Sequence, residues 1–397
     1  MTENSRIFVS IAAYRDSELP QTIRDLVSHA TKPENLVVAI FEQSESRLPS
    51  STFPEGITFI HDFAPASESR GVGWARARLQ QHFDGEEFYL QLDGHHRFAP
   101  GWDAKLMAEF RRCESERPIF SGYLPPIPEG CEFDPRGGTL RASHFDPEGV
   151  LHLRFHPIAG GIEGPPVRGS YLSGHFIFAP GELVRDVPYD PDFYFFGEEV
   201  SLSARAFTHG YDVFHPRRSV VWHRYGRGGA RRHWDDHSST WRELQSKSVE
   251  KWRRLFGHEP LIGGADGFGT RRSLAEFERW TGVDFRWQVI HPSALTGEPP
   301  PSKATEGWVL AEGLVNQRSV TVALPSLADE PHESVYIAIR DATPRDVFVL
   351  RQSAAEYARL REQGLTATIR FREGPLSVVV LPFFNGAWCA SREWMLA

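Results

Sequence analysis

Apolar residues come in short unbroken runs along the first quarter of the chain, and amphipathic segments separate these runs. Each run is rich in β-branched and aromatic residues, which is typical of a buried strand. The runs cover residues 6–12, 36–41, 57–61 and 87–92. Between them, apolar positions at helical spacing predict helices over residues 19–30, with Pro20 near the helix start, and over residues 74–83. Strands that alternate with helices predict an α/β fold.

The middle of the chain has a weaker pattern. A helix is predicted over residues 102–113, but residues 123–169 are rich in Pro and Gly, show little periodicity and are expected to be irregular. Strand-like and helix-like segments resume after this stretch. The predicted strands are 172–178, 211–216 and 219–222, and the predicted helical segments are 198–209 and 234–256.

The last quarter of the chain has a β-type pattern. Residues 284–301 end in consecutive prolines and predict a linker. Short runs such as VTVAL and SVYIAI follow, and one helix-like segment, 353–363, interrupts them. We therefore expect a small β-rich domain over residues 296–397, after an α/β domain over residues 1–295.

The composition fits a globular protein of about two domains, with 397 residues of which 40% are hydrophobic and 24% charged. The formal net charge of −8 gives no overall basic surface for nucleic acid. Three cysteines are too few for a disulfide framework, and no apolar run indicates a signal peptide or a membrane span. We expect a cytoplasmic protein with no nucleic-acid partner.

The strand predicted over residues 87–92 ends at three residues with chemical potential, Asp93, Gly94 and His95. In open α/β sheets, ligands bind beyond the carboxyl ends of the strands. A carboxylate and an imidazole two residues apart in a turn can face one cation, and Gly94 keeps the approach open. Oxygen and nitrogen ligands together suit Mn²⁺ and other borderline divalent ions. For so short a motif, a turn aspartate beside a surface histidine is the alternative.

Two adjacent carboxylates, Glu198 and Glu199, follow an aromatic run and open a predicted helix. Acidic residues at a helix N-terminus are electrostatically favourable, so helix capping alone would account for them. The alternative is a binding role. Gly197 lets the backbone approach a ligand, and the preceding aromatic residues would wall a pocket for a sugar.

The strand-like run over residues 219–222 is followed by His223, Arg224 and, further on, Arg227. A histidine at a strand end is a candidate third metal ligand, and a structural histidine is the alternative. The arginines, the nearby glycines and the basic segment 231–237 form a candidate phosphate contact, because guanidinium groups match phosphate oxygens and glycine N–H groups approach them closely. A solvated surface explains these residues equally well.

Motifs of several other enzyme classes are absent. The sequence holds no GxSxG, Walker A or HExxH motif, and no GxGxxG follows the first strand. Hydrolases with a nucleophile elbow, P-loop NTPases, zincin proteases and dinucleotide-binding domains are therefore not indicated.

Taken together, four segments resemble a known family. They are IFVSIAAYRD, ARARLQQHFDGEEFYLQLDGHHRFAPGWD, SGHFIFAPG and FFGEEVSLSARAFTHGYDVFHPRRSVVWHRYGR. In order and spacing they are similar to the UDP-N-acetylglucosamine-dependent glycosyltransferases that modify hydroxyproline in a cytoplasmic protein, which are related to the mucin-type polypeptide GalNAc-transferases. The resemblance covers residues 6–260. It implies a GT-A fold with a Rossmann-like nucleotide-sugar-binding domain, and retention of the anomeric configuration.

The resemblance implies a metal site. Asp93 and His95 would bind Mn²⁺ or Mg²⁺, with His223 as the third ligand. Gly94 stands where the family usually has Ser. We expect this change to spare the metal, because the middle residue of the motif need not be a ligand.

The resemblance also implies a donor site. The first strand and its turn would hold the uridine through Ala12, Ala13, Tyr14, Arg15 and Asp16. Arg76 and Arg227 would add positive charge near the diphosphate. Glu198 or Glu199 would contact the sugar and the acceptor, and the sequence does not favour one over the other.

The implied activity is metal-dependent transfer of a sugar, N-acetylglucosamine, from a UDP-sugar to a hydroxyl group on a protein, peptide or glycan. One alternative keeps the donor and takes a polysaccharide, peptide or natural-product acceptor, which the β-rich domain would help to select. Another is an inactive protein that binds a nucleotide sugar or a glycan. A nucleic-acid-binding scaffold built on the Arg-rich segment is disfavoured by the net negative charge.

Overall fold

The computed structural model describes residues 5–128, 133–146, 148–226, 231–256, 267–286, 288–291, 294, 316–327, 329–342, 346–371 and 374–396. These residues fall into two compact units. The first unit draws on residues 1–143, 152–282 and 292–301, and the second on residues 144–151, 283–291 and 302–397. The predicted boundary between residues 295 and 296 lies outside the described residues and stays a prediction.

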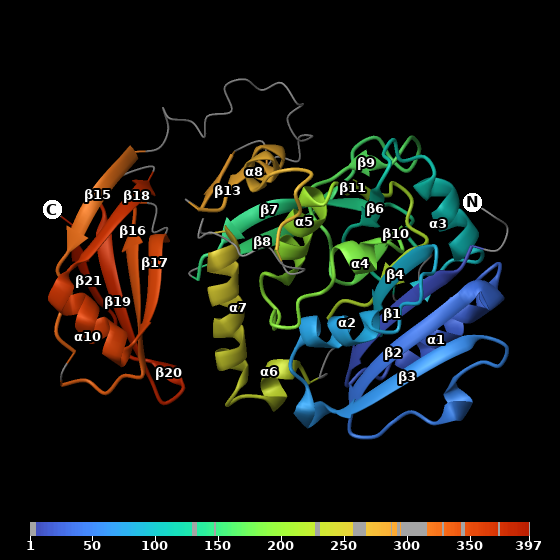
Figure 1. The fold of residues 1–397 in the computed structure, drawn as a ribbon, viewed down its shortest axis with the longest axis horizontal. Helices are drawn as coiled ribbons and strands as arrows, with labels where there is room; N and C mark the ends of the chain where they lie inside the picture. Colours follow the sequence, from blue (N-terminus) through green and yellow to red (C-terminus); the bar gives the residue numbers. More distant parts are fainter. Residues whose placement is uncertain are drawn as a thin grey trace. The chain divides into compact units, whose positions relative to one another are not determined.

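An eight-stranded sheet forms the middle of the first unit (Figure 1). In spatial order its strands are β3 (Thr58–Pro65), β2 (Leu36–Ser44), β1 (Ile7–Tyr14), β4 (Phe88–Asp93), β10 (Phe176–Pro180), β6 (Pro118–Ser121), β11 (Asp212–His215) and β9 (Val167–Arg168). The first four are parallel, and β10 enters antiparallel beside β4. The carboxyl ends of β1, β2 and β4 therefore meet at one edge of the sheet, where ligands bind in open α/β folds.

Helices cover both faces of this sheet. Alternate residues of β1 point to opposite faces, so Ile7 and Ile11 pack in one core with α1 and α3, and Phe8 packs in the other with α2, α4 and α5. The helices of this unit are α1 (Leu19–Ser28), α2 (Val72–Gln80), α3 (Trp102–Phe110), α4 (Leu183–Asp186), α5 (Glu198–Thr208), α6 (His233–Asp236), α7 (Trp241–Phe256) and α8 (Leu274–Thr281). The predicted α/β architecture is confirmed.

Two smaller strand pairs lie outside the eight-stranded sheet. β5 (His96–Phe98) pairs antiparallel with β12 (Val221–His223), which sets His223 opposite His96. β7 (Gly138–Phe145) pairs with β8 (Leu151–Pro157). The prediction that residues 123–169 are irregular is therefore wrong for β7 and β8. Much of β8 is exposed, so it carries no apolar run by which the sequence could reveal it.

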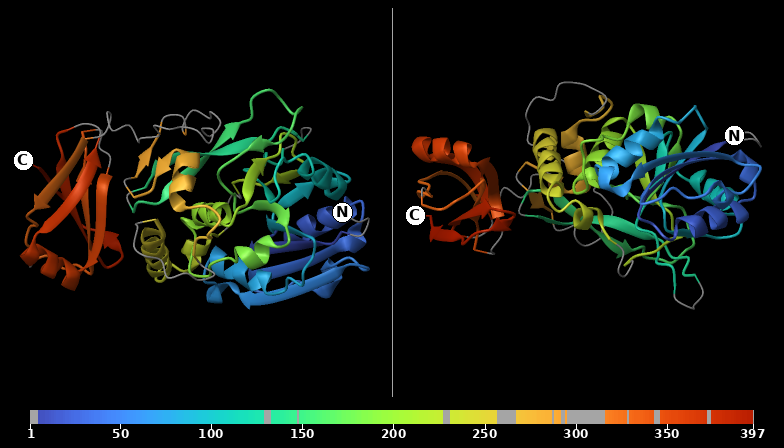
Figure 2. Two further views of the ribbon diagram at one scale, coloured as in Figure 1. Left: turned by 45° about the horizontal axis from the view of Figure 1, so that its top comes forward. Right: turned by 90° about the horizontal axis from the view of Figure 1, so that it is seen from below.

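The second unit is β-rich, as the sequence predicts (Figure 2). Its elements are β13 (Val283–Asp284), β14 (Val289–Ile290), β15 (Asn316–Val322), β16 (Ser334–Arg340), β17 (Asp346–Ser353), α10 (Ala354–Gln363), β18 (Leu365–Phe371), β19 (Ser377–Phe384), β20 (Ala387–Trp388) and β21 (Arg392–Met395). Val335, Ile337 and Ile339 of β16 lie in its apolar core. No helix in the described part of the chain combines the length and apolar character that crossing a membrane requires.

Candidate active site

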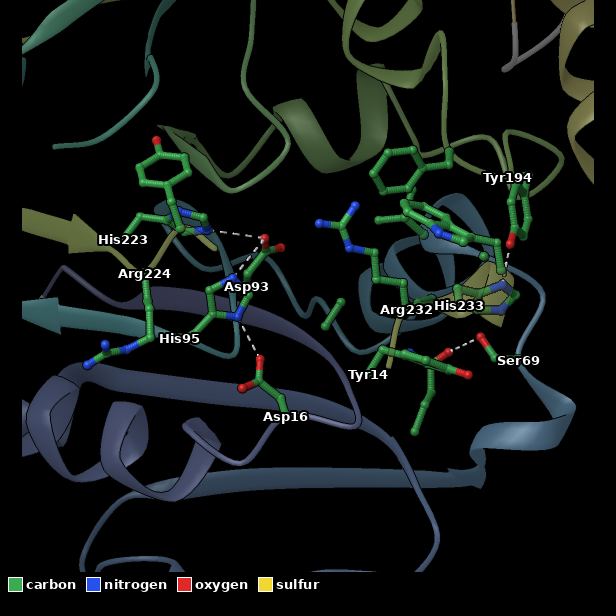
Figure 3. A pocket seen from close by; sticks show the side chains of 18 of the residues that line it. Tyr14, Asp16, Ser69, Asp93, His95, Tyr194, His223, Arg224, Arg232 and His233 are labelled. Carbon is green, nitrogen blue, oxygen red and sulfur yellow. Dashed lines mark hydrogen bonds and ion pairs between the residues drawn. The ribbon is translucent and has the colours of Figure 1, made fainter. Parts of the chain in front are cut away.

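A cavity of about 450 Å³ opens at the carboxyl ends of β1, β2 and β4 (Figure 3). Tyr14 and Asp93, which end β1 and β4, line it together with Gln43 of β2. Its other walls come from α2 and from segments that follow β10 and β12. They include Tyr194, Phe195, His223, Arg224, Tyr225, Arg232, His233 and Trp234.

Asp93, His95 and His223 converge in this cavity (Figure 3), with one ligand atom of each lying within 4.8 Å of the others. The Nε2 atoms of His95 and His223 lie 3.9 Å and 3.6 Å from Asp93 Oδ2. Asp93 ends β4, His95 lies in the turn before β5, and the pairing of β5 with β12 brings in His223. One carboxylate and two imidazoles are a suitable donor set for Mn²⁺, so these residues fit the metal that the sequence resemblance implies.

The protonation states at this point also suit a cation. Burial would raise the pKa of the Asp93 carboxyl, but His223 and Arg76 hold that pKa well below its usual range. Burial, together with the neighbouring His223, holds the pKa values of His96 and His175 well below the usual range of histidine. Asp93 therefore presents a charged carboxylate, the form that binds metals, and the neighbouring His96 and His175 are neutral.

Asp16 orients His95. Its Oδ2 lies 2.6 Å from His95 Nδ1, which leaves Nε2 on the side of Asp93. A carboxylate on the far nitrogen of a ligating histidine fixes the tautomer and the ring orientation. Gly94 makes this contact possible, because a Cβ there would lie 2.6 Å from Asp16 Oδ2 and 3.1 Å from the Cβ of Ala13.

Arg76 lies behind Asp93 and is almost fully buried. It is not among the residues that line the cavity. Its guanidinium lies 3.1 Å from Asp93 Oδ1 and donates a 2.7 Å hydrogen bond to Glu198 Oε1. The hydroxyl of Tyr189 donates a second hydrogen bond to Glu198 Oε1, at 2.5 Å. The buried guanidinium therefore holds both carboxylates in place, and a direct contact of Arg76 with a diphosphate stays a prediction.

Glu199 has different partners from Glu198. Its carboxylate accepts hydrogen bonds from the Gly174 amide (2.7 Å) and the Tyr123 hydroxyl (3.2 Å). Burial, followed by the charge of Glu198, raises the pKa of Glu199 to about 7. Both carboxylates lie in the first turn of α5, where a negative charge is electrostatically favourable, and the N-cap residue is Gly197. The two neighbouring carboxyl groups thus differ in environment, and neither lines the cavity.

His96 and His175 pack around His223. The ring centroids are 4.1 Å apart for His175 and His223, which stack, and 5.0 Å apart for His96 and His223. His175 Nε2 accepts the amide of Leu124 at 3.2 Å, which fixes its ring. His175 has no distinguishing pattern of its own in the sequence, although it stands in the segment SGHFIFAPG directly before β10.

The first strand contributes to the cavity unevenly. Ala12 and Tyr14 line it, while Ala13 is buried. The hydroxyl of Tyr14 donates a 2.6 Å hydrogen bond to Asp236 of α6, and burial followed by this bond raises the pKa of Tyr14 to about 12. Arg15 forms ion pairs with Asp236 and Glu45. Asp236 had no sequence signal, because it joins the first strand from 222 residues away.

Two arginines line the cavity, Arg224 and Arg232 (Figure 3). Arg224 Nε lies 3.4 Å from Glu18, and the guanidinium of Arg232 lies 5.4 Å from the ring centroid of Trp234. Arg227, which the family resemblance places near the diphosphate, lies outside the described residues. Among the described residues, the candidate phosphate contact thus has two arginines, and the side chain of Arg224 points away from Asp93 in Figure 3.

Comparison with known proteins identifies related sequences and structures. A family model described as "Glycosyltransferase (GlcNAc)" matches residues 6–58 and 53–287. A crystal structure of GalNAc-T7 with UDP, GalNAc and Mn²⁺ is similar with a TM-score of 0.49 and 17% identity, covering 65% of this chain and 49% of that chain. S. aureus TarS 1–349 in complex with UDP-GlcNAc is similar with a TM-score of 0.37 and 10% identity, covering 63% and 73%. The chain thus spans about half the length of GalNAc-T7, and no curated protein matches it.

Proposed function

The chain belongs to the glycosyltransferase (GlcNAc) family, and we propose that it transfers N-acetylglucosamine from UDP-N-acetylglucosamine to a hydroxyl acceptor in a metal-dependent reaction that retains the anomeric configuration. The first unit, a GT-A type domain in this proposal, carries the donor site. The cavity of about 450 Å³ at the carboxyl ends of β1, β2 and β4 is called the donor cavity from here.

The convergence of Asp93, His95 and His223 in that cavity carries the proposal. A divalent cation bound there would act as a Lewis acid on the negative charge that develops as the diphosphate departs. Asp16 would orient His95, and Arg76 would orient Asp93, through the hydrogen bonds that join each pair. The precise placing of ligands by buried partners is what a metal site requires.

The lining of the donor cavity supports a nucleoside diphosphate. Ala12, Tyr14, Gln43 and Ser69 form the side near the strand ends, where the uridine would lie. Arg224 and Arg232 would meet the phosphate oxygens, and the ring of Trp234 stands beside Arg232. The diphosphate would then bridge from the nucleoside side to the candidate metal ligands.

Glu198 and Glu199 lie behind the reacting atoms in this proposal. Glu198 would act through Arg76 as a positioning residue, since the hydrogen bonds that its carboxylate accepts come from the buried residues Arg76 and Tyr189. Glu199 would position the turn before β10 through its bond to the Gly174 amide. In a retaining transfer the acceptor attacks on the leaving-group side and its proton passes to a phosphate oxygen of UDP, so no protein nucleophile is needed.

Release of UDP from a panel of UDP-sugars, with and without Mn²⁺, tests this function. We expect slow metal-dependent release from UDP-N-acetylglucosamine and much slower release from UDP-glucose. Metal-independent release, or none from any UDP-sugar despite tight UDP binding, would refute the proposed reaction. In the second case an inactive nucleotide-sugar-binding protein would be the better description.

A further inference from the structure

A second cavity, of about 610 Å³, adjoins the donor cavity. Tyr225 lines both cavities, and its ring centroid lies 4.4 Å from that of His223. On the same side, the amide of His223 donates to the carbonyl of Pro125, a residue of the second cavity, at 3.1 Å. The second cavity therefore begins next to the candidate metal ligands.

The described residues that line the second cavity are largely apolar and offer few hydrogen-bonding groups. The rings of Phe155 and Tyr225 face it, and prolines, which have no N–H to donate, supply much of its backbone. These prolines are Pro125, Pro126 and Pro157. The amide of Leu124 already donates to His175, and its carbonyl already accepts from Tyr225. The charged lining residues, Asp134 and Arg136, form an ion pair with each other.

The position of Phe155 depends on a glycine. A Cβ at Gly138 would lie 1.9 Å from Phe155 Cε2, so the ring rests directly against the backbone of β7. Phe155 is nevertheless 48% exposed, and Tyr225 is 45% exposed. Two aromatic rings thus stand open toward one cavity, at the side where the sugar of a bound donor would be attacked.

We propose that the second cavity is the acceptor site and that it takes a small apolar alcohol, with the hydroxyl at the Tyr225 end and a ring system against Phe155. This proposal rests on the proposed function. The volume lies in the range of cavities that bury a drug-sized ligand. A glycan or a peptide backbone would lose hydrogen bonds to water here without gaining enough new ones, because the described lining residues leave few donors open to the cavity.

The reaction step is a substitution at the sugar. The alcohol oxygen bonds to C1 of the sugar as the bond between C1 and the diphosphate oxygen breaks. The electron pair of the broken bond stays on UDP, and the alcohol proton passes to a phosphate oxygen. Tyr225, which separates the two cavities, would touch both reactants.

The experiment offers three acceptors to the full chain with UDP-N-acetylglucosamine and Mn²⁺: 2-naphthylmethanol, cellotetraose and a serine-containing proline-rich peptide. Products are detected by mass spectrometry, and binding of 2-naphthylmethanol by saturation-transfer NMR. We expect transfer to 2-naphthylmethanol alone. Transfer only to cellotetraose or only to the peptide, or no binding of 2-naphthylmethanol, would overturn the proposal.

Two variants locate the site. Phe155→Ala removes a ring, and Ile158→Asp puts a charge into the apolar lining. Each should raise the KM for 2-naphthylmethanol by about tenfold or more, while UDP release in the absence of any acceptor stays unchanged. Phe384→Ala, at an exposed phenylalanine of the second unit, is the matched control. An unchanged KM in both cavity variants would overturn the proposed acceptor site. If the wild type releases no UDP in the absence of an acceptor, the proposed function itself is refuted.

Discussion

The two units of this chain differ in what they bury. Behind the donor cavity, Arg76 and Glu198 are about as buried as core leucines. In the second unit the core is aliphatic and aromatic, and Asp341 and Ser377 are the buried polar side chains among the described residues after 316. Burying a charge costs free energy, and pairing it with an opposite charge does little more than offset this cost, so a buried ion pair adds little to stability. The first unit therefore buries charged side chains behind its candidate site, whereas the core of the second unit is apolar.

If this contrast is right, the largest effect should come from the charge at the centre of the site. Asp93→Asn removes the charge of a candidate metal ligand and leaves Arg76 with one carboxylate fewer. We expect the Mn²⁺-dependent affinity for UDP to fall by more than about 100-fold, with the melting temperature little changed. Asp62→Asn is the matched control, because Asp62 pairs with Arg78 and His82 and does not line the donor cavity. Equal losses of UDP affinity in Asp93→Asn and Asp62→Asn would contradict the assignment of Asp93 as a metal ligand.

We expect a smaller effect from Asp16, which contacts the candidate ligand His95 and is not itself a candidate metal ligand. Asp16→Ala deletes the partner of His95 Nδ1 and should weaken Mn²⁺ binding about 10- to 100-fold. Titration followed by electron paramagnetic resonance of free Mn²⁺ measures this affinity. Asp16→Asn keeps an acceptor oxygen and should recover part of the loss. If Asp16→Ala binds Mn²⁺ as tightly as the wild type, Asp16 has no role in orienting His95.

Gly94→Ser tests how closely Asp16 packs against position 94. The family resemblance implies only that Gly in place of the usual Ser spares the metal, whereas in this structure a serine side chain would collide with Asp16. We expect about a tenfold loss of Mn²⁺ affinity through displacement of Asp16. Combined with Asp16→Ala, the change should then cost little more than Asp16→Ala alone. Additive losses would mean that Gly94 acts by another route.

Glu199→Gln should act on stability rather than on metal binding. The pKa of Glu199 is about 7 in the folded protein and near 4.5 in the unfolded chain. The raised pKa therefore stabilises the folded protein below about pH 4.5, and this stabilisation is lost as the pH rises through about 7. Glu199→Gln carries no titratable group at this position, so its stability does not fall in this way as the pH rises. Its melting temperature relative to wild type, measured in EDTA, should therefore be higher at pH 8 than at pH 5. A difference that does not vary with pH would contradict the buried carboxyl.

The smallest effect on the donor cavity should come from the second unit. Ile337 is fully buried in its apolar core, so Ile337→Ala should cost about 2–5 kcal/mol of that unit's stability. Binding of UDP with Mn²⁺ should stay at the wild-type value below the melting temperature. A parallel loss of UDP affinity would show that the second unit supports the donor site.

The sequence predicts the strands that carry the candidate site better than it predicts the residues that position the candidate metal ligands. Regular apolar runs indicate β1 and β4, and Asp93 follows from its place at the end of β4. The roles of Asp16 and His175 depend on contacts across 79 and 51 residues of sequence, which no local pattern records. Arg76 shows the same limit, because only tertiary packing reveals that its partners are Asp93 and Glu198. β7 and β8 were missed because their pairing, rather than an apolar run, defines them.

Calorimetric titration of UDP into the full chain, in Mn²⁺ and then in EDTA, tests the central claim most directly. The arrangement of Asp93, His95 and His223 predicts tight binding in Mn²⁺ and a loss of at least tenfold in EDTA, since the diphosphate would lose its cation. Equal affinity in the two buffers would contradict a metal site at the end of β4.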